Sequence, residues 1–258
     1  MGGGSNRRKG EGPDGFVLAD LTPPFLKRRA AFYIDGFNLH HSILDLGRRE
    51  LLWLDLAALG KLIIARNERL VGTVWVSAHK PQKRDRMTAL YAYEQALRGR
   101  GVRCLMGHFV LHGDHCHACG HQWMDATEKQ SDVNLALAVA ADAAADRFDV
   151  AYILTTDGDH AATARFVKES YPNKRVVSVA PPGRHHNRQI IPWCDAKVSI
   201  ERKMLDRAAL PDRVRSGRTW VERPQSWRPR DPVPETPPPG PPPAGTKPGH
   251  LRLVVSNG

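Results

Sequence analysis

The sequence predicts an α/β fold in which a mainly parallel sheet is covered on both faces by helices. Between residue 29 and about residue 210, short apolar segments rich in β-branched residues alternate with longer segments of helical character. This alternation is typical of β-α-β units, whose strands are buried on both faces. We therefore expect a three-layer α/β/α architecture.

Six segments are predicted to be strands because they are short, apolar and bounded by turn residues. They are residues 30–34, 73–77, 102–110, 150–155, 175–179 and, with a weaker pattern, 196–200. Four segments have the length and composition of helices: 54–66, 84–100, 128–147 and 161–170. Residues 127–130 have the pattern of a capping box, so a helix start is predicted at Thr127, with Glu128 and Asp132 on one helical face.

The length of the chain suits one large domain, and both ends have the composition of tails. Residues 1–28 are rich in Gly and Arg without periodicity, and residues 211–258 are dense in Pro. We expect a disordered N-terminal tail, a domain over residues 29–210 and a disordered Pro-rich C-terminal tail. The Pro-rich segment is either a passive tail or a docking segment for a protein partner.

The net charge of +11, from 38 Lys and Arg against 27 Asp and Glu, favours an anionic partner. Residues 1–29 carry +3 (six basic, three acidic) and residues 210–258 carry +4 (eight basic, four acidic), so much of the excess lies in the tails. In the tails this positive charge serves either solubility or loose attraction to nucleic acid.

No secretory signal, no long apolar run and no disulfide framework is visible, so a cytoplasmic protein without a membrane segment is expected.

Acidic residues occur where a parallel sheet would gather its active site. Asp35 ends the first predicted strand, and Asp157 and Asp159 follow the fourth. The carboxyl ends of parallel strands form the edge where ligands bind. Two carboxylates about 4 Å apart repel by roughly 4 kcal/mol at an effective dielectric of about 20, so converging acids must be protonated or bind a cation. An oxygen-rich site suits Mg²⁺ or Mn²⁺ and phosphodiester chemistry, although each acid taken singly could be a helix cap or a turn residue.

Three segments form an ordered set of motifs: Phe32-Tyr33-Ile34-Asp35-Gly36-Phe37-Asn38-Leu39, Glu128-Lys129-Gln130-Ser131-Asp132-Val133-Asn134-Leu135-Ala136 and Thr155-Thr156-Asp157-Gly158-Asp159. This set resembles the NYN domain of the PIN-like ribonuclease superfamily over residues 29–206, and the similarity includes residues 178–184. The resemblance implies a PIN-like fold and metal-dependent cleavage of RNA. By position it also implies Asp35, Asp132, Asp157 and Asp159 as ligands of Mg²⁺ or Mn²⁺, with Glu128 nearby and Asn38 near the scissile phosphate.

The sequence departs from the family pattern at two positions. Gly158 stands where a hydroxyl residue is usual, and His160 stands where an apolar residue is common. Thr155 and Thr156 are candidates to replace the missing hydroxyl as a substrate contact.

Residues 112–123 concentrate soft metal ligands in a predicted insertion. Cys116-x-x-Cys119-Gly is a turn through which two thiolates can bind Zn²⁺. His121 and His112 are the nearest candidates for the other two ligands of a structural zinc site, which would fix the segment leading to Glu128. Further candidates are His108, His115, His117 and Cys104; the alternatives to zinc are a polar loop with two reduced thiols or a redox pair.

Basic residues follow two of the predicted strands at the same edge of the sheet. Lys83 and Arg84 follow residues 73–77, and Arg184 and Arg188 follow residues 175–179, so these four are candidate contacts to an RNA backbone. Most basic residues of the segment 84–103 are equally explained by a solvated helix face. Trp123 is a candidate for stacking on an unpaired base or for packing against the zinc turn.

Three functions fit these observations. The first is a metal-dependent endoribonuclease that uses the aspartate cluster. The second is a non-catalytic RNA-binding or regulatory NYN module that retains the acids. The third, a metal-dependent phosphatase, fits poorly because Asp35 is followed by Gly36 and Phe37 rather than by a second acid two residues later. The RNA target and the oligomeric state are left open by the sequence.

Overall fold

The computed structural model describes residues 27–79 and 84–229 and has a central sheet of seven strands in this part of the chain. The strand order is β4-β3-β2-β1-β5-β6-β7, and all neighbouring strands are parallel except the antiparallel pair β3–β4. The predicted mainly parallel sheet is therefore confirmed. The strands are β1 (Arg28–Asp35), β2 (Glu68–Ala78), β3 (Arg103–His115), β4 (Gln122–Lys129), β5 (Val150–Leu154), β6 (Arg175–Ala180) and β7 (Ala196–Ser199).

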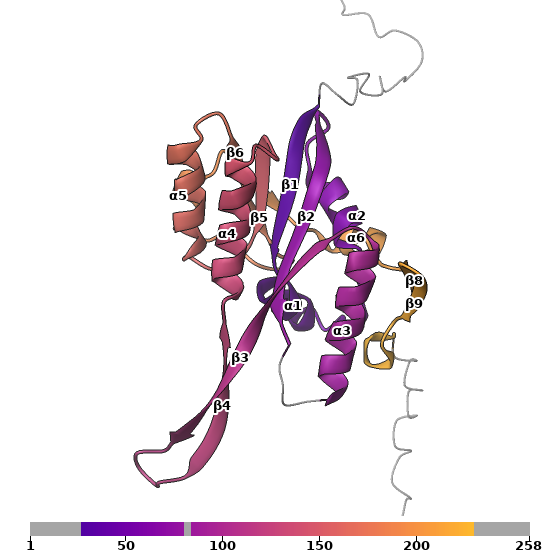
Figure 1. Cartoon of the computed structure of the whole chain (residues 1–258), viewed down its shortest axis with the longest axis vertical. Coiled ribbons are helices and arrows are strands. Elements are labelled where there is room, and N and C mark those ends of the chain that lie inside the picture. The colour runs from indigo at the N-terminus through magenta and orange to yellow at the C-terminus, as the bar shows by residue number, and fades with distance from the viewer. Residues whose placement is uncertain (1–26, 80–83, 230–258) are drawn as a thin grey trace, which may run out of the picture. The chain divides into compact units, whose positions relative to one another are not determined.

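Helices cover both faces of the sheet (Figure 1). Along β1, Phe32 and Ile34 point into one hydrophobic cluster, whereas Ala31 and Tyr33 point into the other, as expected for alternating side chains. The first cluster includes residues of α1 (Gly36–Asp45), α2 (Leu56–Ile63), α3 (Arg84–Gly99) and α6 (Arg202–Arg207). The second includes residues of α4 (Ser131–Ala144) and α5 (His160–Ser170). Short 3-10 helices are η1 (Arg49–Leu52), η2 (Ile191–Trp193) and η3 (Gln225–Trp227).

The strand order reverses at β1. The chain proceeds from β1 through β2 to β3 on one side, and β5, β6 and β7 follow on the other side. In open α/β sheets this reversal leaves a crevice at the carboxyl ends of the two central strands, and ligands bind there. Asp35 is the last residue of β1, and Thr155 directly follows β5, so both lie at this crevice.

The predicted capping box at residues 127–130 is wrong. Residues 122–129 pair with residues 108–115 as strand β4, and α4 begins only at Ser131. Gln130 has a positive φ of 80°, which separates the strand from the helix. Glu128 still caps α4, because its Oε1 atom accepts hydrogen bonds from the backbone N–H (3.0 Å) and the hydroxyl (2.6 Å) of Ser131.

Helix α1 was not predicted, because it begins with the poor helix formers Gly36 and Asn38. Its start is stabilised by Asp35, whose side chain accepts a 3.0 Å hydrogen bond from the backbone N–H of Asn38. Only glycine fits at position 36, because a Cβ atom there would lie 2.4 Å from the carbonyl oxygen of Val76. The close approach of α1 to β2 therefore depends on this glycine.

Residues 211–229, expected to begin a disordered tail, are folded. They form the hairpin β8 (Arg213–Ser216) and β9 (Thr219–Glu222), followed by η3. Trp227 is 7% exposed, and its ring centroid lies 5.5 Å from that of Tyr93 and 6.4 Å from that of Trp53. The domain thus extends beyond residue 210, while residues 1–26 and 230–258, which hold most of the expected tails, lie outside the described residues.

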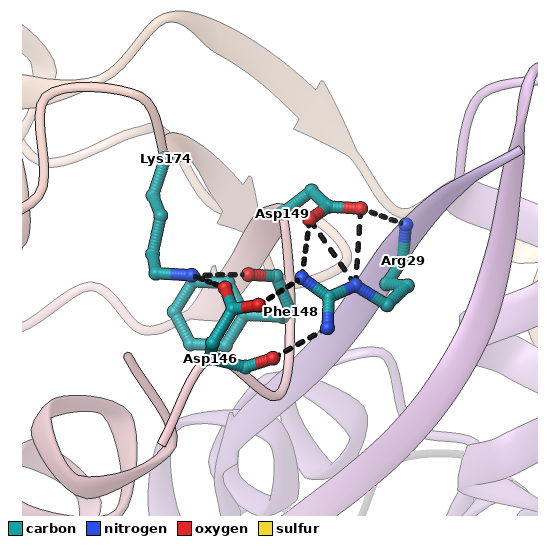
Figure 2. Close-up of polar contacts among 5 residues, drawn as sticks. All are labelled: Arg29, Asp146, Phe148, Asp149 and Lys174. Atoms are coloured by element: carbon teal, nitrogen blue, oxygen red, sulfur yellow. Dashed lines mark hydrogen bonds and ion pairs between the residues drawn. The ribbon is translucent and has the colours of Figure 1, made fainter. Parts of the chain in front are cut away.

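A charged cluster joins three segments at the edge of the sheet opposite the carboxyl ends (Figure 2). The Arg29 guanidinium binds the carboxylate of Asp149 (2.6 Å) and that of Asp146 (3.0 Å). Lys174 donates to Asp146 (2.6 Å) and to the carbonyl oxygen of Phe148 (2.7 Å). This cluster ties the start of β1 to the α4–β5 connection and to the start of β6.

Among residues 27–79 and 84–229, none of the helices combines the length and the apolar character that crossing a membrane requires.

Candidate metal centre

Asp35 is held in place by both strands that border the crevice. Its side chain is 6% exposed, and its Oδ2 atom accepts a 3.0 Å hydrogen bond from the hydroxyl of Thr155. Its other oxygen caps α1 through the N–H of Asn38. The carboxylate is therefore oriented before any ligand arrives.

Asn38 links the two sides of the crevice. Its amide nitrogen donates to Asp35, and its amide oxygen accepts hydrogen bonds from the backbone N–H of Thr156 (3.1 Å) and from the Thr156 hydroxyl. The side chain amide of Asn187 donates to the carbonyl oxygen of Thr156 at 2.9 Å. Asn38 and Thr156, both predicted to contact substrate, are thus engaged with each other, and they position Asp35.

Asp132 and His160 meet Asp35 at this point. The Nε2 atom of His160 lies 3.5 Å from Oδ1 of Asp132, and one donor atom from each of Asp35, Asp132 and His160 lies within 4.8 Å of the others. Within the described residues, this is the one group of three or more His, Cys, Asp or Glu side chains with such spacing. The three residues come from the end of β1, the first turn of α4 and the first residue of α5.

His160 is 2% exposed, and its buried Nε2 atom has no hydrogen-bond partner. A buried polar nitrogen without a partner costs free energy, roughly 1–3 kcal/mol, unless a ligand satisfies it. The sequence marked His160 only as a departure from the family pattern. Its position directly after Asp157-Gly158-Asp159, at the carboxyl end of a strand, is the signal that would have identified it.

The acids at the site influence one another electrostatically. Burial raises the pKa of Asp132, and the carboxylates of Asp35, Asp157 and Glu128 raise it further, while His160 acts in the opposite direction. The carboxylates of Asp35, Asp157 and Glu128 thus all act on the Asp132 carboxylate. A bound cation would relieve this repulsion.

The remaining predicted acids surround the group of three. Asp157 is half-buried and forms a tight turn, in which its Oδ1 accepts the backbone N–H of Asp159 at 2.9 Å and its own N–H donates to Thr155. Asp159 is exposed and is not one of the three converging ligands. Glu128 approaches closely because position 107 on β3 is glycine: a Cβ atom there would lie 2.6 Å from its Oε1.

Gly158 lies against the side chain of Gln189. A Cβ atom at residue 158 would lie 1.6 Å from Oε1 of Gln189, so the Gln189 amide occupies the space beside this glycine. Gln189 is exposed and its amide ends a flexible side chain, so it supplies a polar group next to the crevice. No pattern in the sequence pointed to this residue.

A cavity of about 870 Å³ adjoins the acidic group. Gly36 and Phe37 line it directly after Asp35, and Glu128 lines it from β4. Its other walls are largely apolar and aromatic, and they include Leu39, His40, Ile43, Trp75, Tyr93, Phe109 and Trp227.

The four residues predicted to contact an RNA backbone lie in different surroundings. Arg184 forms an ion pair with Asp45 at the end of α1, and Arg188 lies exposed in the segment after β6. Arg84 begins α3, and Lys83 lies outside the described residues.

The expected zinc ligands lie on the β3–β4 hairpin, which extends away from the helices (Figure 1). Cys116 and Cys119 lie in the turn at its tip, but in the described residues neither His112 nor His121 joins them in a group of converging donor atoms. His112 pairs with Asp125 within the hairpin, four residues before Cys116 and thus roughly 13 Å away along the strand. The ring of His121 stacks on that of Trp123, with centroids 6.2 Å apart. The predicted Cys₂His₂ set within one chain is therefore not assembled.

No family model matches the chain, and no curated protein matches it. Among solved structures, a protein of unknown function from Vibrio parahaemolyticus is 19% identical with a TM-score of 0.46, over 69% of this chain and 95% of that chain. A hypothetical protein from Neisseria gonorrhoeae with bound ppGpp is 9% identical with a TM-score of 0.21, over 70% of this chain and 96% of that chain. Similarity at this level does not inform on the activity of this chain.

Proposed function

We propose that the protein is a metal-dependent ribonuclease that binds a divalent cation through Asp35, Asp132 and His160. The observation that carries this proposal is that donor atoms of Asp35, Asp132 and His160 lie within 4.8 Å of one another, and that the buried Nε2 of His160 has no hydrogen-bond partner. Two carboxylates and one imidazole complete much of a cation's coordination shell and leave positions for a substrate oxygen.

The donor set favours Mn²⁺ over Mg²⁺. Mg²⁺ prefers an all-oxygen shell, whereas imidazole nitrogen suits transition metals and carboxylate oxygen suits Mn²⁺ as well. His160 therefore changes the expectation that four aspartates bind the metal. Asp157 and Glu128 then act around the cation, where they can orient water and accept a proton.

A cation bound here would supply Lewis-acid stabilisation of a phosphoryl oxygen and would lower the pKa of water. The residues of the chain supply the geometry. Thr155 and Asn38 fix the Asp35 carboxylate, and the start of α5 brings His160 to the same point. Such fixed positions reduce the reorganisation needed during the reaction.

The adjoining cavity favours single-stranded RNA as the substrate. Its aromatic walls, Phe37, Trp75 and Phe109 among them, can pack against an unpaired base, and stacking of this kind is tolerant of base identity. A base in the cavity would place its phosphate near Glu128, which lines the cavity, and near Asp35, which directly precedes the lining residues Gly36 and Phe37. The net charge of +11 would support attraction of the RNA chain.

The test is cleavage of a labelled single-stranded RNA with Mn²⁺, Mg²⁺ or a chelator. Asp132→Asn should lower the rate by on the order of 100-fold or more, because it removes a ligand. Asp125→Asn, on the same hairpin that carries Glu128, should leave the rate unchanged. Equal cleavage by the wild type and Asp132→Asn would remove the catalytic assignment. Binding of RNA without cleavage under any metal condition would instead identify a non-catalytic RNA-binding module.

A further inference from the structure

The turn at the tip of the β3–β4 hairpin has the geometry of half a metal site. Cys116 and Cys119 flank a tight turn, in which the backbone N–H of Cys116 donates to the carbonyl oxygen of His121 at 2.8 Å. The N–H of Gly120 donates to the carbonyl oxygen of Cys116 at 2.8 Å, and Gly120 has a positive φ of 71°, which favours glycine. A Cys-x-x-Cys-Gly turn of this kind lets two thiolates bind one Zn²⁺ ion.

The chain itself does not complete the site. His115 and His117 flank Cys116, and their rings are in contact, with centroids 4.6 Å apart. His121 is stacked on Trp123. Among the described residues, no group of three or more converging His, Cys, Asp or Glu donor atoms includes Cys116 or Cys119.

The surroundings of the turn are suited to contact with another protein surface. Val110, Leu111, Trp123 and Met124 are all exposed on the hairpin. By the pairing register, Trp123 lies opposite Asp114 on the same face of the hairpin. Trp123 is exposed, and so is Cys119 in the turn, so this end of the hairpin gains from being covered.

We propose that two copies of this chain join at the hairpin tips and bind one Zn²⁺ through Cys116 and Cys119 of each copy. A two-fold axis through the metal makes the same surface of both copies meet, and it supplies four thiolates in the tetrahedral set typical of structural zinc. The Trp123 side chains then lie beside the shared metal. This inference is independent of the ribonuclease proposal, because its ligands and its readouts involve neither RNA nor the acidic group.

The test measures zinc content and molar mass of the full-length protein. We expect about one zinc ion for every two chains and a dimer that dissociates when a strong chelator removes the zinc. The double variant Cys116→Ser, Cys119→Ser should lose both the zinc and the dimer. The matched control Cys194→Ser changes a half-buried thiol outside the hairpin and should retain both.

Replacement of the imidazoles separates a shared site from one within a single chain. His121→Ala and the double variant His115→Ala, His117→Ala should keep zinc and remain dimeric, and the Co²⁺-substituted protein should show the intense absorption of a four-thiolate site. One zinc per monomeric chain would overturn the proposal, as would loss of zinc in either imidazole variant. Absence of zinc from the wild type, or a dimer that persists in the cysteine variant, would also overturn it.

Discussion

The Nε2 atom of His160 lies 3.5 Å from Oδ1 of Asp132, and it is buried without a hydrogen-bond partner. This relationship joins the first residue of α5 to the first turn of α4 across the crevice at the carboxyl end of β1. Because His160 contributes an imidazole nitrogen, the ligand set contains both oxygen and nitrogen rather than only carboxylates that repel one another. The preference for a transition metal follows from this contact.

We expect His160→Gln to weaken Mn²⁺ binding by about 10- to 100-fold while affecting Mg²⁺ binding less, because the variant removes the imidazole nitrogen. Metal-induced shifts in the melting temperature measure both affinities. His185→Gln, which changes an exposed histidine in the segment after β6, is the control. A variant that binds Mn²⁺ as tightly as the wild type would show that His160 is a buried structural histidine.

Gly107→Ala should displace Glu128 and uncouple β3 from the start of α4. The added Cβ atom would lie 2.5 Å from the carbonyl oxygen of Lys129, which is backbone and cannot move without opening the hairpin. We expect a loss of stability of about 1–3 kcal/mol together with reduced RNA cleavage. Gly113→Ala on the same strand is the matched control, because its Cβ would meet only the sulfur of Met124 at 3.9 Å. Urea denaturation of both variants gives the comparison, and equal stability would contradict the expectation.

The metal-free protein should lose stability through Asp132 as the pH rises. Burial raises the pKa of Asp132 in the folded state, so the folded state binds more protons than the unfolded state between the ordinary value of about 3.9 and the raised value. The free energy of unfolding therefore falls as the pH rises from the ordinary pKa to the raised pKa, and it stays lower at higher pH. The effect is small because the side chain is half exposed. Asp132→Asn should then be slightly more stable than the wild type near pH 7 without metal, and this gap should close in acid. A variant less stable than the wild type at pH 7 would contradict this sign.

Asp149 should show the opposite pH dependence. Hydrogen bonds from the Arg29 guanidinium lower the pKa of Asp149, so its contribution is present above about pH 3.9 and is lost as the pH falls through the lowered folded value. We expect Asp149→Asn to lower the free energy of unfolding by roughly 1–2 kcal/mol near pH 7 and by little in strong acid. Urea denaturation at the two pH values measures this, and a cost that stays constant with pH would indicate a steric effect.

Trp227→Ala should destabilise the whole domain, because this ring packs on Tyr93 and Trp53 within the core. Substitutions of this kind cost about 3–5 kcal/mol. Trp220, 59% exposed on β9, provides the matched control, and its replacement should cost under about 1 kcal/mol. Thermal unfolding of both variants tests whether the domain ends near residue 210 or extends past residue 227.

The hydrophobic pattern was sufficient to predict the parallel strands of the central sheet, but not the antiparallel strand β4. The segments 30–34, 150–155 and 175–179 are continuous apolar runs, and they became β1, β5 and β6 because such runs are stable only when buried on both faces. Helix α1 was missed because tertiary packing of Gly36 against β2 outweighs weak local helix propensity. The folded segment after residue 211 was missed for a similar reason: Trp227 is ordered by distant aromatic rings rather than by its proline-rich neighbours.

By itself the sequence determined the edge of the sheet to which Asp35 and Asp157 belong, because strand ends are encoded locally. Only the tertiary structure decided which side chains meet. Pairing of β3 with β4 moved Glu128 from a helix to a strand, packing of α5 turned His160 inward, and the stacking of His121 on Trp123 left the two cysteines without a third ligand. These outcomes depend on contacts between segments far apart in the chain, and local propensity does not specify such contacts.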